Sequence, residues 1–328
     1  MKRMLVTILI GLILILATVI VVEKKNNEKE KNSKTTTTKI KVAEVTHSVF
    51  YAPWYVALKN NYFENLDIEV ILTSGANNVA AAVLSGDVEI GFCGPEATIY
   101  IYNENNKDYL KSFAGLTKRD GQFLVLRNGV NYHDFKDING LTILAGRASG
   151  MPLLNFKNAL KNENITNVKV DESVDFANLT SAFIAGNGDG VNLFEPNATK
   201  LVKEGYGFIA DSVGTYSGVV PYTAFNAKIS YIENNKDIIK SFYEGIKKGL
   251  EYVHTHSSKE IAEVIISEFP DTSIADLEVM IDNYKNADSW FKTPKIPEDS
   301  FKNLQDIMID NKDIKAYVNY KDLIYELN

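Results

Sequence analysis

The sequence predicts an α/β fold with two lobes joined by a hinge, in which mainly parallel sheets are flanked by helices. From Lys39 onward, short runs rich in Val, Ile and Leu alternate with helical segments, and this alternation is typical of βαβ units. The pattern begins again near Asn128. A chain of 328 residues is long enough for about two folded units.

Three strand–helix units make up the first set. The expected strands are Ile40–Val45, Asp67–Leu72 and Val88–Phe92. The helices that follow them open at Pro53, after Gly75 and at Pro95, and proline is favoured in a first helical turn. In open parallel sheets, ligands bind beyond the carboxyl ends of the strands. The loops that follow the strands are therefore the candidate site.

The second set contains the expected strands Leu141–Gly146 and Gly190–Phe194, and from Ile229 the pattern is helical to the end. The expected first lobe comprises residues 39–127 together with a second part at residues 221–328. The second lobe is expected at residues 128–220. We expect the chain to cross between the lobes in the loops at residues 128–131 and 214–222.

The N-terminus predicts export from the cytoplasm. Lys2 and Arg3 precede Met4–Val22, nineteen residues without a charge, which as a helix would span about 28 Å. Glu23 follows where a lipoprotein signal needs cysteine, and small residues in an A-x-A-like pattern are missing. We expect residues 1–22 to be an uncleaved membrane anchor, with a cleaved signal peptide as the alternative, and residues 23–38 to be a disordered tether. The folded part would then lie outside the cytoplasmic membrane, or be secreted after cleavage.

Composition and motifs exclude several classes of function. The net charge of −7, from 42 acidic and 35 basic residues, argues against a nucleic-acid partner. Cys93 is the single cysteine, which excludes a disulfide framework and any CxxC site. One SxxK motif, Ser289–Lys292, lacks the companion motifs of a serine enzyme, and His254 and His256 are spaced to point to different faces of a helix. We therefore expect neither an enzyme nor a metal or cofactor site.

Six segments carry a resemblance to a known family. They are His47–Ala57, Tyr62–Phe63, Leu84–Ala97, Leu116–Gly121, Leu193–Pro196 and Val220–Phe225. In this order they resemble the solute-binding proteins of the nitrate, sulfonate and thiamine-pyrimidine-precursor group, and LSGDVEIG within the third segment is the most specific block. The resemblance covers roughly Lys39 to Asn328.

The resemblance implies a type II periplasmic-binding-protein fold and a role as the solute-binding component of an ABC importer. The implied partners are a small solute and a membrane permease with its ATPase, and a monomer is expected. A pyrimidine-type thiamine precursor or a similar heterocycle is the favoured solute. The alternatives are sulfonate- or nitrate-type anions, or an anchored extracellular sensor domain. Fungal pyrimidine-precursor synthases share this resemblance but carry a CCCFC motif, whereas this chain has Cys93 alone.

The candidate ligand-binding residues lie in the loops that follow the strands. They are Tyr51, Trp54, Tyr55, Ser74, Gly75, Gly94, Glu96, Arg119, Ser149, Glu195 and Tyr222. Aromatic side chains offer flat apolar surfaces to a ring, and glycine lets the backbone approach a ligand closely.

Each of these residues also has a purely structural interpretation. Trp54 and Tyr55 could pack on the sheet, and Gly75 could be an ordinary turn residue. A carboxylate such as Glu195 or Glu96 could cap its helix instead of accepting a hydrogen bond from a ring amine. Arg119 could grip an anion, or pair with Asp120 or Glu96 and shape the cleft. The loops carry at least as many acids as bases, which favours a neutral or amine-bearing heterocycle over a sulfonate or nitrate.

Overall fold

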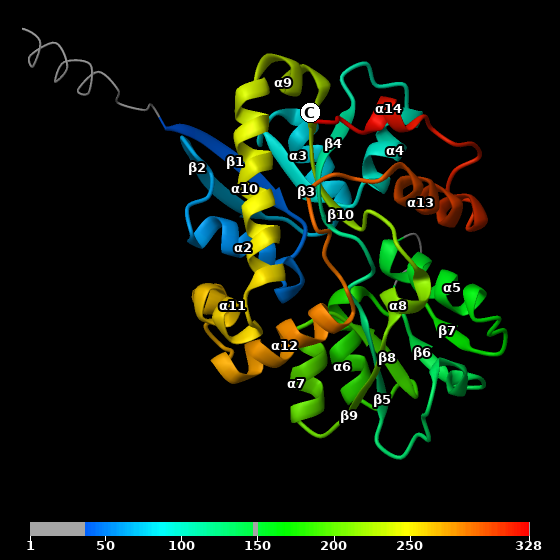
Figure 1. The fold of residues 1–328 in the computed structure, drawn as a ribbon. Helices are drawn as coiled ribbons and strands as arrows, with labels where there is room; N and C mark the ends of the chain where they lie inside the picture. Colours follow the sequence, from blue (N-terminus) through cyan, green and yellow to red (C-terminus); the bar gives the residue numbers. More distant parts are fainter. Residues whose placement is uncertain (1–36, 147–149, 328) are drawn as a thin grey trace, which may run out of the picture. The chain divides into compact units, whose positions relative to one another are not determined.

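The computed structural model describes residues 37–146 and 150–327, and residues 39–328 form one compact unit (Figure 1). The predicted anchor and all but the end of the predicted tether lie outside the described residues. Within the described ranges, no helix is both long enough and apolar enough to cross a membrane.

The first sheet has five strands in the order β2-β1-β3-β10-β4. Their bounds are Leu66–Leu72 for β2, Thr38–Glu44 for β1, Ile90–Cys93 for β3, Thr223–Lys228 for β10 and Leu110–Thr117 for β4. β1 and β3 are parallel, whereas β10 runs antiparallel to both β3 and β4. β3 is buried throughout, so its apolar residues contact both faces of the core.

Helices follow the first three strands, as the sequence predicts. After β1 come the short 3-10 helix η1 (Val49–Tyr51) and α2 (Ala52–Lys59), after β2 comes α3 (Ala76–Ser85), and after β3 comes α4 (Glu96–Asn103). Ser48 caps η1 through its side chain, and Gly86 ends α3 in the left-handed conformation that favours glycine.

The second sheet also has five strands, in the order β7-β6-β8-β5-β9. Their bounds are Lys169–Asp171 for β7, Thr142–Leu144 for β6, Gly190–Leu193 for β8, Phe123–Arg127 for β5 and Gly207–Ser212 for β9. The helices of this region are η2 (Phe135–Ile138), α5 (Met151–Asn162), η3 (Phe176–Asn178), α6 (Leu179–Ile184), α7 (Asn197–Lys203) and α8 (Val213–Ser217).

Two sequence-based expectations need correction here. β5 was expected in the first lobe, but it pairs with β8 and β9 in the second sheet, so the chain crosses before residue 123. The sheets are mixed rather than mainly parallel, because β5 and β10, each the first strand after a crossing, enter antiparallel to both neighbours. The two crossing segments run together: the Val220 N–H donates to Lys118 O and the Tyr222 N–H to Thr117 O, both at 3.0 Å.

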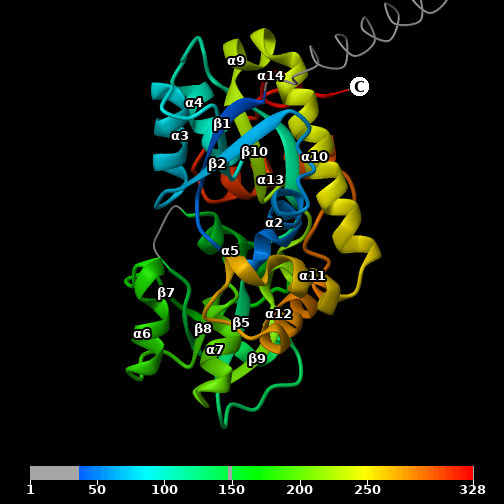
Figure 2. The ribbon, with the colours of Figure 1, turned by 90° about the vertical axis from the view of Figure 1, so that its left-hand side faces the viewer.

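The C-terminal region is helical, as expected, but it does not contact the first sheet alone. Its helices are α9 (Ile229–Asn234), α10 (Lys236–Thr255), α11 (Ser258–Ile265), η4 (Ile266–Glu268), α12 (Ile274–Asn286), α13 (Glu298–Asp310) and α14 (Tyr320–Leu323). α10 packs on α2, where a Cβ on Gly249 would lie 2.2 Å from Pro53 O. α12 reaches the second lobe through the ion pair of Lys203 with Asp276, and Figure 2 shows α12 beside α7.

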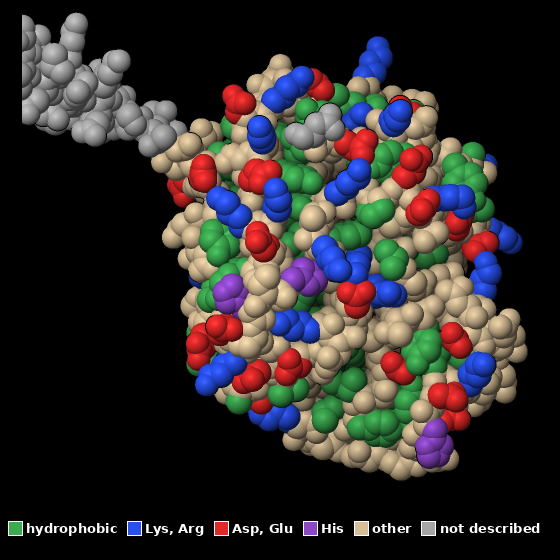
Figure 3. All heavy atoms as spheres, in the orientation of Figure 1, with side chains coloured by type: hydrophobic (Ala, Val, Ile, Leu, Met, Phe, Trp, Pro, Cys, Tyr) green, Lys and Arg blue, Asp and Glu red, His purple; other side chains and the backbone are tan. Residues whose placement is uncertain are grey.

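Charges of both signs are interspersed over the face shown in Figure 3. This pattern differs from the basic stripe that follows a nucleic-acid backbone.

Candidate functional site

Segments from both sheets and from the crossings meet around Phe50. Its ring centroid lies 5.5 Å from that of Tyr51, 5.6 Å from Phe194 and 5.7 Å from Tyr222. Phe50 and Tyr51 belong to η1, Phe194 follows β8, and Tyr222 precedes β10. A Cβ on Gly121 would lie 2.7 Å from the Phe50 ring, so the first crossing also passes against it. We call these four aromatic residues the interlobe aromatic group.

Glu96 is a buried carboxylate beside this group. The residue is 8% exposed, and its Oε2 has no hydrogen-bond partner among the described residues. It begins α4 and folds back over Gly94, where a Cβ would lie 1.9 Å from Oε2, so glycine is needed there to leave room for the carboxylate. Burial raises the pKa of Glu96 to about 7, because water no longer solvates the charged form.

Two tyrosines lie close to Glu96, and a second acid, Asp120, lies close to one of them. Burial raises the pKa of Tyr51, and the Glu44 and Glu96 carboxylates raise it further. Burial likewise raises the pKa of Tyr222, and so do nearby Asp120 and Glu96. Asp120 is fully buried, and burial holds its pKa well above the usual value, although the Gln122 N–H donates to Oδ1 at 2.7 Å. We call Tyr51, Glu96, Asp120 and Tyr222 the acidic cluster.

Two buried amides were missed by the sequence analysis. The side chains of Gln122 and Asn192 are fully buried, and neither amide has a hydrogen-bond partner in the described part of the chain. Asn192 pairs with Leu124 across β8 and β5, so Gln122 and Asn192 lie on the same face of the sheet. A polar residue inside the apolar strand GVNLF was the available signal, because a buried strand position normally excludes an amide unless it is partnered.

The structure brings four of the predicted site residues together, namely Tyr51, Gly94, Glu96 and Tyr222. Trp54 instead lies in the hydrophobic core. It is fully buried, with its ring centroid 5.2 Å from Phe225 and 5.4 Å from Phe63. α2 turns Trp54 inward between the first sheet and α10, so the packing interpretation applies to this residue.

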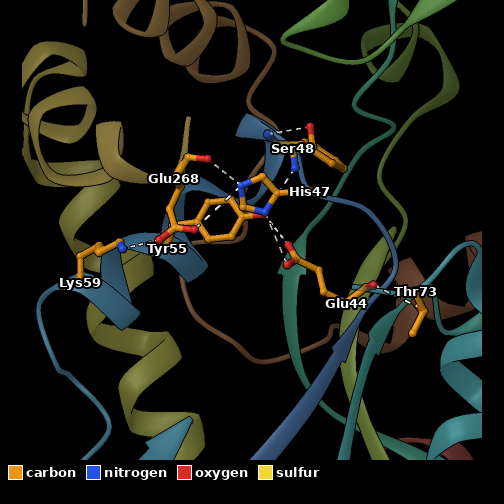
Figure 4. A network of polar contacts seen from close by, with 8 residues as sticks. Glu44, His47, Ser48, Tyr55, Lys59, Thr73 and Glu268 are labelled. Carbon is orange, nitrogen blue, oxygen red and sulfur yellow. Dashed lines mark hydrogen bonds and ion pairs between the residues drawn. The ribbon is translucent and has the colours of Figure 1, made fainter. Parts of the chain in front are cut away.

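Tyr55 supports the site loop from behind (Figure 4). Its hydroxyl donates to Glu44 at the end of β1, accepts from the Ser48 N–H at 3.3 Å, and lies 3.1 Å from His47 Nδ1. His47 Nε2 in turn lies 3.0 Å from Glu268 O in η4, and the Glu44 carboxylate raises the pKa of His47. Tyr55 is 1% exposed, so this network fixes the loop that carries η1 and leaves the tyrosine no free face.

Glu195 was expected to face a ligand, but protein groups occupy its carboxylate. The Thr199 N–H and hydroxyl donate to it at 2.9 and 2.7 Å, and Asn283 Nδ2 donates at 2.8 Å. Its own backbone is also held, since Ser48 Oγ donates to Glu195 O at 2.7 Å and the Glu195 N–H donates to the Tyr284 hydroxyl at 3.0 Å. Glu195 therefore joins the second sheet to η1 and α12.

The remaining predicted residues are not part of the acidic cluster. Arg119 Nη1 donates to Gly214 O at 3.2 Å and Nη2 lies 3.9 Å from Asp288, so the guanidinium is paired, but not with Asp120 or Glu96 as expected. Ser74 and Gly75 are exposed at the start of α3. Ser149 lies outside the described residues.

Metal chemistry finds no donor set in the described ranges, where no group of three or more His, Cys, Asp or Glu residues is placed to hold an ion. A cavity of about 40 Å³, lined by residues such as Phe113, Tyr243 and Tyr320, shares no lining residue with the acidic cluster.

Comparison with known proteins places the chain in a family. Residues 49–260 match the family described as NMT1/THI5 like. The "Putative binding protein YtlA" of Bacillus subtilis (strain 168) is 39% identical over 292 residues, which cover 88% of this chain and 87% of that protein. The chain therefore belongs to the NMT1/THI5-like family, and the resemblance expected from the sequence is confirmed.

Solved structures confirm the two-lobed binding-protein fold. The alkanesulfonate-binding protein SsuA from Xanthomonas axonopodis pv. citri, bound to MOPS, superposes with a TM-score of 0.67 at 11% identity, covering 88% of this chain and 99% of that one. The ligand-binding component of an ABC-type import system from Staphylococcus aureus, with zinc bound, gives 0.66 at 12% identity, covering 88% and 97%. At these identities the likeness concerns the fold.

Proposed function

We propose that this chain is the solute-binding component of an ABC importer and captures a flat, amine-bearing heterocycle between its two lobes. A pyrimidine-type thiamine precursor is the solute that we favour. The family, the fold and a relative named as a binding protein support the general role. Capture followed by release to a permease requires binding without any chemical step.

The observation that carries the choice of solute is the buried Glu96 carboxylate with one free oxygen. A ring amine could donate to this oxygen, and the nearby Tyr51 and Tyr222 supply aromatic surface beside it. An anionic solute has less support, because Arg119 already contacts Gly214 and Asp288. A sulfonate or nitrate ion would instead need a basic side chain facing it beside Glu96.

The proposed mechanism is hinge motion about the two crossing segments. A solute that contacts both lobes binds best when they approach each other, so binding shifts the population toward the closed form. The closed form is the shape that a permease would recognise. Micromolar affinity corresponds to about −8 kcal/mol, which a stacked ring and a few hydrogen bonds can supply. In this proposal the protein acts as a monomer outside the cytoplasmic membrane, with residues 1–22 as its anchor.

A thermal-shift screen of residues 39–328 tests the proposal. The panel contains 4-amino-2-methylpyrimidine, related thiamine precursors, aliphatic sulfonates, taurine and nitrate. A ligand that binds only the folded state stabilises it by mass action and so raises its melting temperature. At a ligand concentration one hundred times Kd, the free energy of unfolding increases by about 2.7 kcal/mol. We expect stabilisation by the aminopyrimidines. Stabilisation by sulfonates alone would contradict the proposal that the solute is a heterocycle. It would still agree with a role as the solute-binding component of an importer.

A further inference from the structure

In the described part of the chain, no basic side chain stabilises the charged form of the Glu96 carboxylate in the acidic cluster. Of the buried acids in this region, Glu195 is held by Thr199 and Asn283, and Glu44 is held by Tyr55 and lies 3.7 Å from His47. Glu96 and Asp120 remain. Glu96 Oε2 has no hydrogen-bond partner among the residues that the structure describes, whereas the Tyr222 side chain lies close enough to Asp120 to lower the pKa of that carboxyl group by hydrogen bonding.

Among the described residues, four titratable groups lie close enough to Glu96 to sense its charge, and none of them is basic. They are Tyr51 of η1, Cys93 of β3, Tyr100 of α4 and Tyr222 of the second crossing. Each is an acid in its own right, and for each the nearby Glu96 carboxylate opposes ionisation. A buried carboxylate without a counter-charge costs several kcal/mol unless it takes up a proton or meets a cation.

The aromatic rings favour a cation over a neutral molecule at this place. The ring centroid of Phe50 lies within 5.7 Å of those of Tyr51, Phe194 and Tyr222, and the centroids of Phe194 and Tyr222 are 6.3 Å apart. The face of an aromatic ring carries partial negative charge and attracts an organic cation, most strongly where water is displaced. Rings and carboxylates together offer a flat cationic group two kinds of attraction.

From this arrangement we infer that the solute is an organic cation, whose positive charge is held by the Glu96 carboxylate, with Asp120 beside the neighbouring Tyr222. This inference rests on the proposed role as a solute-binding protein and narrows its ligand to positively charged nitrogen heterocycles and similar flat ammonium or iminium groups. The cation replaces the proton that the buried Glu96 otherwise holds. Binding a permanent cation should therefore release a proton to the solvent near neutral pH.

Calorimetry with two ring compounds of matched size tests the inference on residues 39–328, which form one compact unit. The probes are 4-amino-1,2-dimethylpyrimidinium, which is permanently charged, and 2-methylpyrimidin-4-one, which is neutral. We expect the cation to bind at least about tenfold more tightly, a difference of about 1.4 kcal/mol. Its affinity should rise between pH 6 and pH 8 as Glu96 loses its proton, and titrations in buffers of different ionisation enthalpy should show the proton released.

Variants assign the effect to Glu96. Glu96→Gln should reduce the preference for the cation to within about threefold and abolish the proton release. Asp120→Asn should lower the affinity for the cationic probe and leave that for the neutral probe unchanged. This variant tests the inference if Glu96→Gln does not fold. The control is Glu104→Gln, which changes an exposed acid just beyond the end of the same helix and should leave both affinities unchanged.

Failure of the inference and failure of the proposed function differ in outcome. Equal binding of the two rings, with no proton released, would overturn the cationic solute and leave the heterocycle-binding role in place. A complete lack of binding by both probes and by 4-amino-2-methylpyrimidine, with binding of an alkylsulfonate, would instead overturn the proposed ring-shaped solute.

Discussion

At the scale of single residues, Glu96 and Glu195 show how one sequence pattern leads to two different roles. Each follows an apolar strand and stands at the start of a helix. The Glu195 carboxylate receives three hydrogen bonds from Thr199 and Asn283. Glu96 lies over Gly94 with a free oxygen. A buried carboxyl group that destabilises the fold and has an oxygen without a protein partner marks a candidate binding site.

Glu96→Gln should stabilise the protein in the absence of ligand at high pH. The folded state holds the pKa of Glu96 at about 7, above its ordinary value of 4.5, so between these values the folded state binds more protons than the unfolded state. The stability of the natural protein therefore falls as pH rises through this window and is constant above it. At pH 8, the free energy of unfolding of Glu96→Gln should exceed that of the natural protein by about 3 kcal/mol. This difference should vanish near pH 4.

Urea unfolding of both proteins from pH 4 to pH 8 checks this prediction. Glu104→Gln is the control and should follow the natural protein at each pH. Parallel curves for the two proteins would show that the pKa of Glu96 is the same in the folded and unfolded states, and would contradict the prediction.

At the scale of elements, α12 and η1 link parts of the chain that are distant in sequence. Tyr284 of α12 is buried, and its ring centroid lies 5.1 Å from that of Phe50 and 5.2 Å from that of Phe123. Its hydroxyl accepts a hydrogen bond from the Glu195 N–H. Trp290 Nε1 donates to Phe50 O at 2.7 Å. These contacts hold η1 in place beside the acidic cluster, and the polar network around Tyr55 holds it from the other side.

Tyr284→Phe should lower stability by about 1–3 kcal/mol, because the buried Glu195 N–H loses its acceptor while ring packing is retained. Urea unfolding measures the loss, and hydrogen exchange should become faster at the Glu195 amide. Tyr317→Phe is the matched control. Its hydroxyl bonds to Asp306 on the surface, so its loss should change stability by less than about 0.5 kcal/mol. Equal losses in both variants would contradict a special role for α12.

At the scale of the whole molecule, two mixed sheets are joined by paired crossing segments, and the aromatic and acidic residues lie where these segments meet both sheets. Under the proposed function, a ligand in this place would contact both lobes and the crossing segments, and its binding would be coupled to the angle between the lobes.

Ligand binding should make the molecule more compact. In small-angle X-ray scattering of residues 39–328, a saturating ligand from the thermal-shift screen should reduce the radius of gyration from the unliganded value, which is about 19 Å for a chain of this length. Glu96→Gln with the same ligand concentration serves as the weak-binding control. An unchanged scattering curve at confirmed saturation would mean that the solute binds without hinge closure.

The sequence by itself predicted most of the elements and the loops that form the candidate site. Alternating apolar strands and helices predicted the two sets of α/β units, and the loops after the strands contain Gly94, Glu96 and Phe194. The division into lobes was less accurate, because β5 pairs in the second sheet. Local patterns predict which residues form a strand, but pairing depends on residues far along the chain.

Only the tertiary structure decided which side chains are free to bind. Trp54 is an aromatic residue of the kind that stacks on a ring-shaped ligand, but its side chain packs against Phe63 and Phe225 in the core. The partners that occupy Glu195 include Asn283, which lies 88 residues further along the chain. A carboxylate at a helix start is ambiguous until all the groups around it are known. Its pKa and its free lone pairs depend on burial and on neighbours that no local sequence pattern records.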